Sequence, residues 1–462
     1  MAINPTKQSN GLKTKVSVTS ALAAYAASSA ERELPAVVTI RASYHLIDSI
    51  AAMISGSRLT AGLAAIAYAK TRSGVGQATV PGTGLSLTPS DAALINGMTA
   101  HADETDDSHA RSLTHPGSVV VPAALAVAEF SGSTGVQLLR AVTLGYDVCC
   151  RMGMALGSYD FHQRGFDTHA FGGIFGAAFA AGALLRFTPV QFQYLASYAA
   201  QSASGVNTWT RDSAHVEKAF DFAGMPARNA LEVTMMVRAG FTGVTDVFDG
   251  DPNFLEIYNP DYSPETLIDE LGTRFEIGAT TIKKWCVATP AQASLDGLKA
   301  LMDANHVTAH DIARVTACIP AESAKIVMDR DMPNVNIQHL LALLLIDGDI
   351  SFNAAHDADR MRDARVLDAR SRIVISLSQT LEPKSRHAFV TIETRDGRRF
   401  ERHVTDVRGT PANAMPKDEI IAKAADLITP ILGKRKAGKL IKVLLEVETV
   451  EDIRSLRSLL TG

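Results

Sequence analysis

The feature that most constrains the fold of this chain is an almost unbroken series of helical segments in its first half. Stretches rich in Ala, Leu and Met predict helices at 17–30, 35–55, 59–70, 89–101, 119–130, 134–156, 173–186 and 189–204. Thr88-Pro89, Thr188-Pro189 and Ser263-Pro264 each place a capping hydroxyl before a proline at the first helical position, and Thr188 with Gln191 fits a capping box. Amphipathic helices must share a core, so these segments predict one large all-helical domain.

The pattern changes after about residue 278. Val, Ile and Thr alternate with polar residues over 313–327, 372–381 and 388–404, as in strands, and Asp396-Gly397 is typical of a hairpin turn. Helices at about 290–305 and 335–347 are interleaved, and the chain turns helical again from Pro416. We predict a mainly α protein, with an all-helical domain over 1–278 that residues 412–462 complete, and a smaller α+β domain over 279–411.

Composition excludes several classes of protein. The formal net charge of −4 does not indicate a nucleic-acid surface of the usual basic kind, although Lys434 to Lys442 form a local basic patch. The 4 cysteines contain no CxxC pair, so a disulfide framework or thiolate zinc site is not expected, and reduced thiols fit a cytoplasmic protein. The N-terminal MAINPTKQSNGLKTK lacks the apolar stretch of a secretory signal. No apolar run reaches the roughly 20 residues of a membrane span.

The segment from His101 to Pro116, HADETDDSHARSLTHP, concentrates ionisable side chains directly after a predicted helix. One interpretation is a metal site formed by His101, Asp103, Asp107 and His115, because carboxylates and imidazoles suit Zn, Mn or Fe. The spacing, however, matches neither HExxH nor an EF-hand loop. A second interpretation is a solvated acidic loop without chemistry.

The third interpretation is an acid–base loop. Histidine exchanges protons near neutral pH, a neighbouring carboxylate can orient it, and such catalysis contributes roughly 10²–10⁴-fold. The proline after His115 restricts the backbone of that histidine. His109 and Arg111 are expected to be solvated. The glycines at 172, 173 and 176 follow no strand, so they indicate close helix packing rather than a dinucleotide-binding loop.

The order of motifs resembles the 2-methylcitrate dehydratase and cis-aconitate decarboxylase family (MmgE/PrpD). Its first motif reads roughly H-x-x-D-x-D-D-T, a short loop and then H-P, which corresponds here to the segment from His101 to Pro116. The resemblance continues through GFDTHAFGGIFGAAFAAGALL (165–185), SASGV (202–206), EKAFDFAGMPARNA (217–230), AGFTGVTDVFDG (239–250), KKWCVATPAQASLDGL (283–298) and MPNVNIQHLLALLLIDG (332–348). It implies a homodimer with the active site between a large helical domain and a lid-like α+β domain. It also implies no metal or organic cofactor.

The resemblance assigns roles to individual residues. His115 matches a catalytic-site histidine and is the expected general acid/base, with Glu104 and Ser108 orienting it or the substrate. Lys218 matches a substrate-binding lysine. Asp107 and His101 complete the first motif and are candidates for substrate binding, although a structural role at the end of its helix is the first expectation for His101.

Three positions depart from the better-known members. Asp167 stands where a histidine is common, with His169 two residues later; Gln292 replaces a lid histidine, and His339 replaces a tyrosine. His339 or His169 is the expected second proton carrier, and Gln292 and Asp167 are expected to bind the substrate. Arg211 is a further candidate, because a guanidinium can bind a carboxylate through two hydrogen bonds.

These residues predict a lyase that dehydrates, hydrates or decarboxylates a small di- or tricarboxylate by acid–base chemistry next to a carboxylate. An epimerase or racemase is the main alternative, and it needs two proton carriers, such as His115 with His339 or His169. A catalytically silent carboxylate-binding homologue is a third hypothesis, motivated by the departures at Asp167 and Gln292. We expect no nucleic acid, membrane or metal partner.

Overall fold

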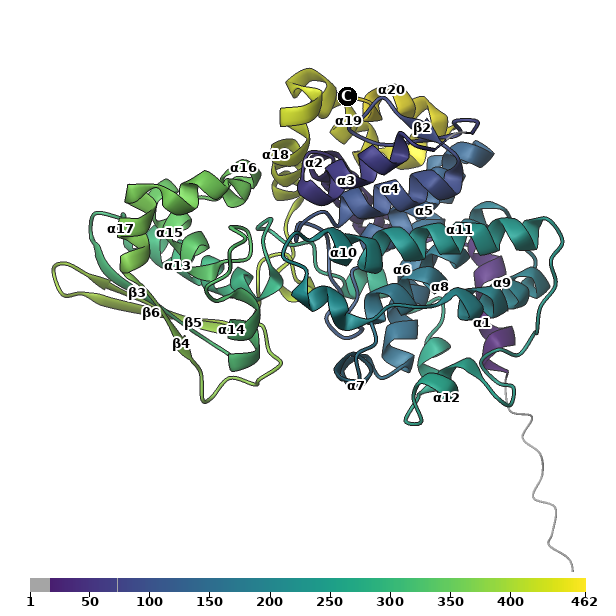
Figure 1. The fold of residues 1–462 in the computed structure, drawn as a ribbon, viewed down its shortest axis with the longest axis horizontal. Coiled ribbons are helices and arrows are strands. Elements are labelled where there is room, and N and C mark those ends of the chain that lie inside the picture. The colour runs from purple at the N-terminus through teal and green to yellow at the C-terminus, as the bar shows by residue number, and fades with distance from the viewer. Residues whose placement is uncertain (1–16, 73) are drawn as a thin grey trace, which may run out of the picture.

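The larger part of the molecule is a bundle of helices. The computed structural model describes residues 17–72 and 74–462, so the expectation about residues 1–15 lies outside the described residues. The helices of this part, purple to teal in Figure 1, are α1 Val18–Ser29, α2 Ala36–Gly56, α3 Thr60–Ala69, α4 Pro89–Ala100, α5 Pro116–Ser131, α6 Gly135–Ala155, α7 Ser158–Gln163, α8 Thr168–Leu184, α9 Pro189–Ser202, α10 Val216–Ala219, α11 Met225–Arg238 and α12 Phe254–Tyr258. A π-helical turn, η2 Phe220–Gly224, joins α10 to α11.

The capping signals in the sequence mostly mark real helix starts. Thr88 caps α4 by accepting from Asp91 N, and Thr188 and Gln191 form the predicted capping box of α9. Ser263 makes no cap hydrogen bond, and the segment after it is only a short 3₁₀ turn, Pro264–Leu267. Helix α8 begins at Thr168, five residues before the predicted start, because the Asp167 side chain caps its first turn.

Glycines set the close approach of α6 and α8. A Cβ at Gly176 would lie 2.5 Å from the carbonyl oxygen of Gly145, and a Cβ at Gly172 would lie 2.6 Å from that of Cys149. Any larger side chain would push the two helices apart. The expectation of close helix packing at these glycines is therefore confirmed.

The smaller part of the molecule combines a four-stranded sheet with helices. The strands are β3 Ile312–Ile319, β4 Ile373–Leu377, β5 Ala388–Thr394 and β6 Arg399–Val404, in the order β4-β3-β5-β6. Strands β3 and β4 are parallel, and β5 and β6 form a hairpin whose turn contains Gly397 at φ 87°. Helices α13 Gln292–Asn305, α15 Ile337–Asp347 and α17 Ala364–Ser371 lie on one side of the sheet, and α16 Phe352–His356 points toward the helical bundle (Figure 1).

The predicted strand over 313–327 is only half correct. Strand β3 ends at Ile319, and helix α14 Ala321–Val327 follows Pro320. Proline cannot continue a strand ladder, and the AESAK segment after it is rich in helix formers. The apolar and polar alternation of this segment therefore reflects a strand followed by an amphipathic helical turn.

Two hydrophobic cores correspond to the two parts. One contains the helices up to α12 together with buried residues of the C-terminal helices α18 Lys417–Leu432 and α19 Lys434–Leu445, among them Leu427 and Leu440. The other contains Trp285, the sheet and α13, α15 and α17. The mainly α fold class is thus confirmed. The boundaries at 278/279 and 411/412 stay predictions.

Helix α2 differs from the expectation that no apolar segment is long enough to span a membrane. The helix has 21 residues, and an 18-residue stretch of it has a mean hydropathy of 1.3, which is enough by length and composition, but 72% of that stretch is buried inside the fold. The helix carries Asp48, whose carboxylate lies 2.6 Å from Lys423 Nζ of α18. Such burial and pairing are typical of a core helix.

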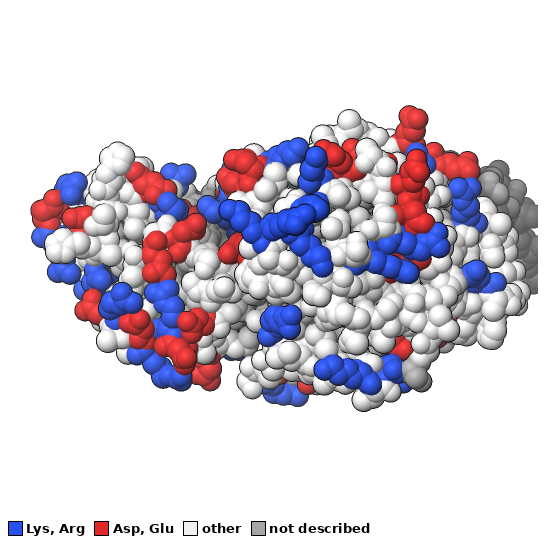
Figure 2. Space-filling view, turned by 90° about the horizontal axis from the view of Figure 1, so that it is seen from above, with Lys and Arg blue, Asp and Glu red and all other residues white. Residues whose placement is uncertain are grey.

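Charged side chains are spread over the surface without one dominant sign. Figure 2 shows acidic and basic side chains alternating over the smaller part and basic side chains gathered on the face of the helical part where the C-terminal helices lie. Lys434, Arg435, Lys439 and Lys442 of α19 are exposed there. The apolar side of this helix, including Leu440, Ile441 and Leu444, is buried in the core.

Candidate active site

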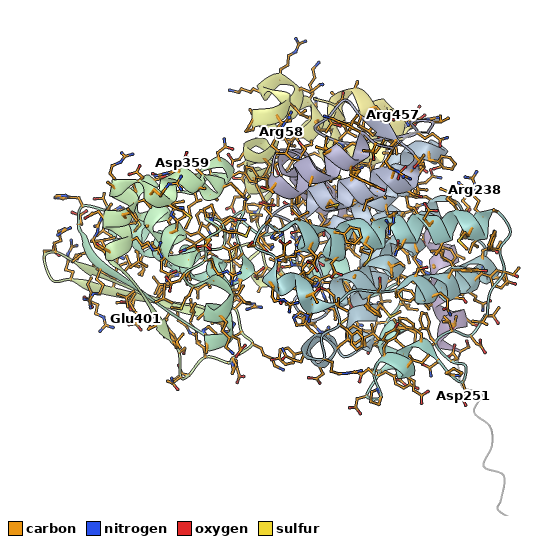
Figure 3. All side chains as sticks on the ribbon, viewed as in Figure 1. Arg58, Arg238, Asp251, Asp359, Glu401 and Arg457 are labelled. Atoms are coloured by element: carbon orange, nitrogen blue, oxygen red, sulfur yellow. The ribbon has the colours of Figure 1, made fainter. Side chains whose placement is uncertain are left out.

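Most of the loop from His101 to His115, including all of its carboxylates, is buried, although charged side chains usually lie at the surface. Asp251, Asp359 and Glu401 project from the periphery (Figure 3). The four carboxyl-bearing residues of the loop, in contrast, are each at most 8% exposed: Asp103, Glu104, Asp106 and Asp107. Burying carboxylates is costly unless each finds a partner. The interpretation of this loop as a solvated acidic segment is therefore wrong.

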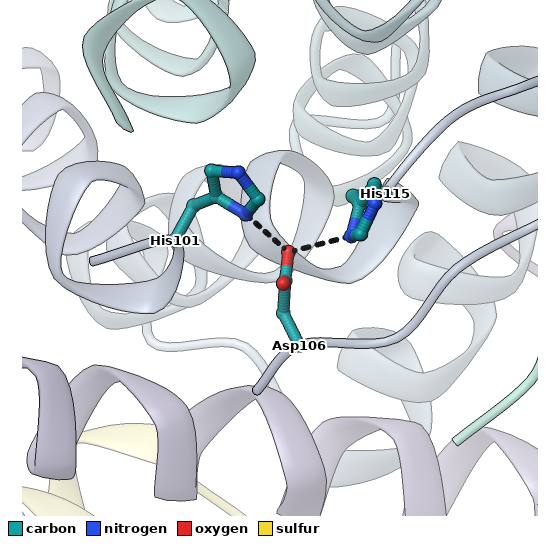
Figure 4. Close-up of side chains that lie close together, drawn as sticks. All are labelled: His101, Asp106 and His115. Atoms are coloured by element: carbon teal, nitrogen blue, oxygen red, sulfur yellow. Dashed lines mark hydrogen bonds and ion pairs between the residues drawn. The ribbon is translucent and has the colours of Figure 1, made fainter. Parts of the chain in front are cut away.

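Asp106 joins two histidines at the centre of the loop. Its Oδ2 atom lies 2.9 Å from His101 Nδ1 and 3.2 Å from His115 Nδ1 (Figure 4). His101 is the residue directly after α4, and His115 directly precedes α5, so two helix ends fix the rings on either side of Asp106. We expected Glu104 or Ser108 to orient His115; the structure places Asp106 in that position.

Glu104 instead pairs with two lysines. Its Oε1 atom accepts a hydrogen bond from Lys218 Nζ, and its Oε2 atom lies 3.9 Å from Lys283 Nζ. Lys283 donates to the carbonyl oxygen of Glu104 at 2.7 Å and lies 3.9 Å from Asp106 Oδ1. His215 Nδ1 is 3.9 Å from Glu104 Oε1. Lys218 and Lys283 hold the pKa of Glu104 well below its ordinary value despite burial, and His101 and His115 do the same for the pKa of Asp106.

Asp107 is occupied by contacts within the fold. Its Oδ2 atom accepts hydrogen bonds from His45 Nδ1 and Tyr146 Oη, both at 2.6 Å, and its Oδ1 atom accepts from Gly117 N at 2.9 Å. The side chain is fully buried. This geometry ties the loop to α2, α5 and α6 and leaves Asp107 no oxygen facing an open space.

Asp103 connects the loop to the smaller part of the molecule. Its Oδ2 atom lies 2.7 Å from His356 Nε2 at the end of α16. His356 Nδ1 contacts the carbonyl oxygen of Phe352 at 2.8 Å, so the ring bridges the two parts of the fold. Asp103 and Asp107 are thus each engaged by other partners, and the metal site considered for His101, Asp103, Asp107 and His115 is not assembled.

A second histidine–aspartate pair lies beside the first. His169 Nδ1 is 2.7 Å from Asp167 Oδ1, and the same oxygen accepts from the backbone N–H of His169. Trp209 Nε1 donates to Asp167 Oδ2 at 2.5 Å. The His169 ring stacks on Phe222 with centroids 3.7 Å apart, and its centroid is 5.2 Å from that of His115. Two imidazoles, each held by a carboxylate, therefore face one another.

Small differences in exposure show which side chains can meet a ligand. His101 and Asp106 have side chains that are 0% exposed, and Lys283 is 1% exposed. His115, His169 and Lys218 have side chains 11%, 10% and 16% exposed. The first group therefore supports the site from behind, and the second group forms its accessible side together with Glu104 and Trp209.

The accessible histidines are neutral at physiological pH. Burial lowers the pKa of His115, although Asp106 opposes this. Burial also lowers the pKa of His169 to about 4, against the effect of Asp167. The Nδ1 atom of each ring lies within 3.2 Å of a carboxylate oxygen, so the neutral form with its proton on Nδ1 leaves a lone pair on Nε2 that is able to accept a proton.

Four residues expected at the site lie elsewhere or have other partners. Gln292 is 2% exposed and binds backbone atoms of Trp285 and Val287 with its side-chain amide. Arg211 is exposed, with no ion pair among the described residues. Ser108 pairs through its backbone with Thr281, at 3.0 and 2.9 Å. His339 is buried in α15, and burial together with Arg370 and Arg360 lowers its pKa to about 4. It makes no contact with the group around Asp106 and Asp167.

His109 corrects another expectation. It is 1% exposed rather than solvated, and its Nε2 atom lies 3.3 Å from Glu276 Oε2. Its Nδ1 atom contacts Ser112 Oγ at 2.7 Å. Despite burial, Cys150 and Glu276 raise the pKa of His109 to about 10. Arg111 is exposed as expected.

Sequence reasoning assigned no role to several residues that the structure brings together. Asp106 was part of the first motif, and Lys283 begins the KKWC motif, so both were visible as motif members. His215, three residues before Lys218, is buried with a left-handed φ of 59°. That backbone conformation is uncommon for histidine and has no sequence signature.

Asp106 and its two histidines, His101 and His115, have ligand-type atoms close enough together for a metal ion. Lys283 Nζ, 3.9 Å from Asp106 Oδ1, already supplies a positive charge beside this carboxylate. A divalent cation would be repelled by that ammonium group. The arrangement fits proton exchange between imidazoles and a carboxylate better than metal coordination.

The fold and site define a two-part α and α+β protein with a histidine, carboxylate and lysine cluster on the helical part. The MmgE/PrpD N-terminal domain matches residues 20–267, and the MmgE/PrpD C-terminal domain matches residues 285–448. The chain belongs to the MmgE/PrpD family, as its motifs predicted.

Curated relatives match along almost the whole chain. Cis-aconitate decarboxylase of Aspergillus terreus is 24% identical over 484 residues, covering 98% of each chain. A cis-aconitate decarboxylase-like protein of Aspergillus oryzae is 25% identical, covering 93% of this chain and 94% of its own. The human cis-aconitate decarboxylase is 23% identical, covering 91% and 90%.

Proposed function

We propose that this protein is a lyase that acts on a small di- or tricarboxylate by proton transfer at a carbon next to a carboxylate. The observation that carries the proposal is His115, accessible on one side and held from behind by Asp106 at 3.2 Å. Full-length similarity to cis-aconitate decarboxylases supports a tricarboxylate substrate. The protein works without a metal or organic cofactor in this proposal, and the homodimer and the cytoplasmic location remain predictions.

The accessible side chains suit an anionic substrate. Lys218 Nζ lies 5.3 Å from the centre of the Trp209 ring and 5.0 Å from that of Phe222, so its ammonium group is held over two aromatic rings. A substrate carboxylate reaching Lys218 would compete with Glu104 for it. Charge-assisted hydrogen bonds of this kind also stabilise the negative charge that develops as a proton or carbon dioxide leaves.

In dehydration, His115 takes a proton from the carbon next to a carboxylate. The carbon–oxygen bond then breaks, and the leaving hydroxyl group takes a proton from a second acid and departs as water. In decarboxylation, the carbon–carbon bond to a carboxylate breaks and the electron pair stays on carbon, and His115, after taking a proton from water, supplies the proton that completes the product. Decarboxylation needs one proton carrier and dehydration needs a base and a second acid, and both need nearby cations such as those around Asp106 and Lys218.

The second candidate is an isomerase that inverts a carbon next to a carboxylate. It is favoured by His169, because its ring centre lies 5.2 Å from that of His115 and each histidine has its own aspartate. Removal of a proton by one imidazole and its return by the other would invert the carbon. His339, the other expected second carrier, has no contact with the described cluster.

Product analysis separates these reactions. The purified protein is incubated with ¹³C-labelled cis-aconitate, citrate and chiral hydroxy- and amino-dicarboxylates, and products are followed by NMR and chiral chromatography. With one of the tricarboxylates, we expect the wild-type protein to release carbon dioxide or to remove or add water. We expect no turnover in His115→Asn. Inversion without a change in composition supports the isomerase. Binding without turnover in the wild-type protein contradicts both and leaves a silent homologue.

A further inference from the structure

Asp167 has a second carboxyl group beside it, from Asp221. Asp221 lies in the π-helical turn η2 and is 8% exposed. A Cβ at Gly205 would lie 3.2 Å from Asp167 Cβ and 3.3 Å from Asp221 Oδ1, so both carboxyl-bearing side chains pack against the same glycine. π-helical turns occur frequently at functional sites, where the extra residue re-aims a side chain. Here the turn directs Asp221 and the next residue, Phe222, toward Asp167 and His169.

The donors around the two carboxyl groups are unequal. Asp167 accepts from three N–H groups: the backbone and Nδ1 of His169, and Nε1 of Trp209. Asp221 Oδ2 is buried and has no hydrogen-bond partner among the described residues. Two carboxylates in contact cannot both be ionised in a buried site. The proton therefore belongs on Asp221, because Asp167 is the group whose negative charge is already satisfied.

The other charged groups near the pair agree with this assignment. Burial, followed by the charge of Asp167, raises the pKa of Asp221 to about 9, and Glu217 raises it further. The backbone N–H of Val206 opposes this shift, and no lysine or arginine is among its main causes. The charge interactions of His162 and His115 are instead with Asp167 and His169. The charge environment thus matches the hydrogen-bond geometry.

We propose that Asp221 is a positioning residue that carries a proton at neutral pH and donates a hydrogen bond through it to Asp167, which keeps His169 neutral with its Nε2 free. The Asp221 hydroxyl hydrogen bond withdraws negative charge from Asp167. A less negative Asp167 still fixes the His169 tautomer through Nδ1–H but favours the imidazolium form less. His169 is then ready to accept a proton on the substrate side.

The effect of this inference on turnover depends on the proposed function, but the protonation state of Asp221 does not. Infrared spectroscopy tests that state without any substrate. The carbonyl stretch of a protonated carboxyl group lies apart from the carboxylate bands and shifts in D₂O. We expect one such band at pH 7 to disappear in both Asp221→Asn and Asp221→Leu. It should persist in Glu217→Gln, a matched control, because Glu217 is an exposed acid four residues earlier.

The titration of His169, followed by NMR with ¹⁵N-labelled histidine, tests the direction of the coupling. Asp221→Asn replaces a neutral donor with a neutral donor, so the pKa of His169 should stay within a few tenths of its wild-type value. Asp221→Leu removes the donor, so Asp167 becomes more basic and the pKa of His169 should rise by about one unit, a roughly tenfold change in proton affinity. The acid limb of kcat/KM should move in the same way.

Two results would overturn the inference. If the infrared band is unchanged in both Asp221 variants, Asp221 does not hold the proton. If Asp221→Asn lowers the pKa of His169, Asp221 is ionised in the wild-type protein, because removing a negative charge destabilises the imidazolium form. Absence of turnover with every carboxylate would contradict the proposed function and leave both of these measurements interpretable.

Discussion

The two histidine–aspartate pairs of the site look alike but lie in opposite electrostatic surroundings. Asp106 is the carboxylate beside His115, and a second histidine and Lys283 also lie beside it. Asp167 serves His169 and has a tryptophan N–H and a second carboxyl group beside it. The first pair lies on the cationic side of the site, and the second pair lies on its carboxyl-rich side.

The same pair of residue types can therefore have different chemical roles, depending on the charges around it. Near Lys283 and Lys218, an anionic substrate gains favourable charge interactions, so a carboxylate next to the reacting carbon should lie toward His115. Near the ionised Asp167, an additional carboxylate is repelled. His169 is therefore better placed to exchange a proton with an uncharged part of the substrate.

The largest effect is expected from the aspartate of the first pair. Asp106→Asn removes the charge that holds His115 and leaves Lys283 with one fewer counter-charge, so we predict a loss of kcat of about 10²–10⁴-fold. Asp167→Asn should reduce kcat less if the reaction is a lyase reaction. Steady-state kinetics on both variants, with circular dichroism as a control for folding, makes the comparison. Equal losses in the two variants would favour the isomerase.

The next largest effect concerns the lysine that faces the ligand. Lys218→Met removes a charge-assisted hydrogen bond worth roughly 1.5–3 kcal/mol, so KM should rise about 10- to 100-fold. Arg211→Met is the matched control, because Arg211 is an exposed cation on a neighbouring 3₁₀ turn without an ion pair among the described residues. It should leave KM within about twofold. A rise in KM in the Arg211 variant alone would move the carboxylate-binding position out to the surface.

The fold was predictable where local signals decide and less so where tertiary contacts do. Proline and threonine signals located α4 and α9, and Asp396-Gly397 located the β5–β6 hairpin. The helix after Pro320 was hidden by its alternating pattern. In the site, motifs identified His115 and Lys218, but pairing partners such as Asp106, Lys283 and Asp221 depend on side-chain directions that no spacing rule contains.

A moderate effect is expected on the pH dependence of stability. His215 is buried and neutral, and its pKa is lowered to about 3 by burial and by Lys218. An unfolded histidine binds a proton near pH 6.5, so between about pH 6.5 and 3 the unfolded state binds more protons, and stability falls as the pH falls. Between pH 7 and 5 this histidine should account for a loss of roughly 1–2 kcal/mol of unfolding free energy.

Urea unfolding of the wild-type protein and of His215→Gln at pH 7 and pH 5 measures this contribution. The variant should lose less stability than the wild-type protein over the same interval. His310→Gln, in a loop of the smaller part where the ring is largely solvated, is the comparison variant and should behave as the wild-type protein does. An identical pH dependence for His215→Gln and the wild-type protein would show that His215 is not held neutral by the fold.

The smallest effect is expected from the histidine of the other domain. His339 is buried in α15 and contacts none of the described cluster, so His339→Gln should leave kcat and KM within about threefold while lowering stability slightly. Steady-state kinetics checks this expectation. A loss as large as that of Asp106→Asn would show that the smaller part closes onto the site and brings His339 to the substrate. His339 would then be a third functional histidine beside His115 and His169.

The central claim is that His115 exchanges a proton with a carbon next to a carboxylate, and deuterium exchange tests it most directly. Citrate and tricarballylate are incubated with the protein in D₂O, and incorporation is followed by NMR. We predict incorporation at a carbon next to a carboxylate with the wild-type protein and with His339→Gln, and its loss in His115→Asn. Exchange that persists undiminished in His115→Asn, or its absence from the wild-type protein when binding is demonstrated by calorimetry, would contradict the account.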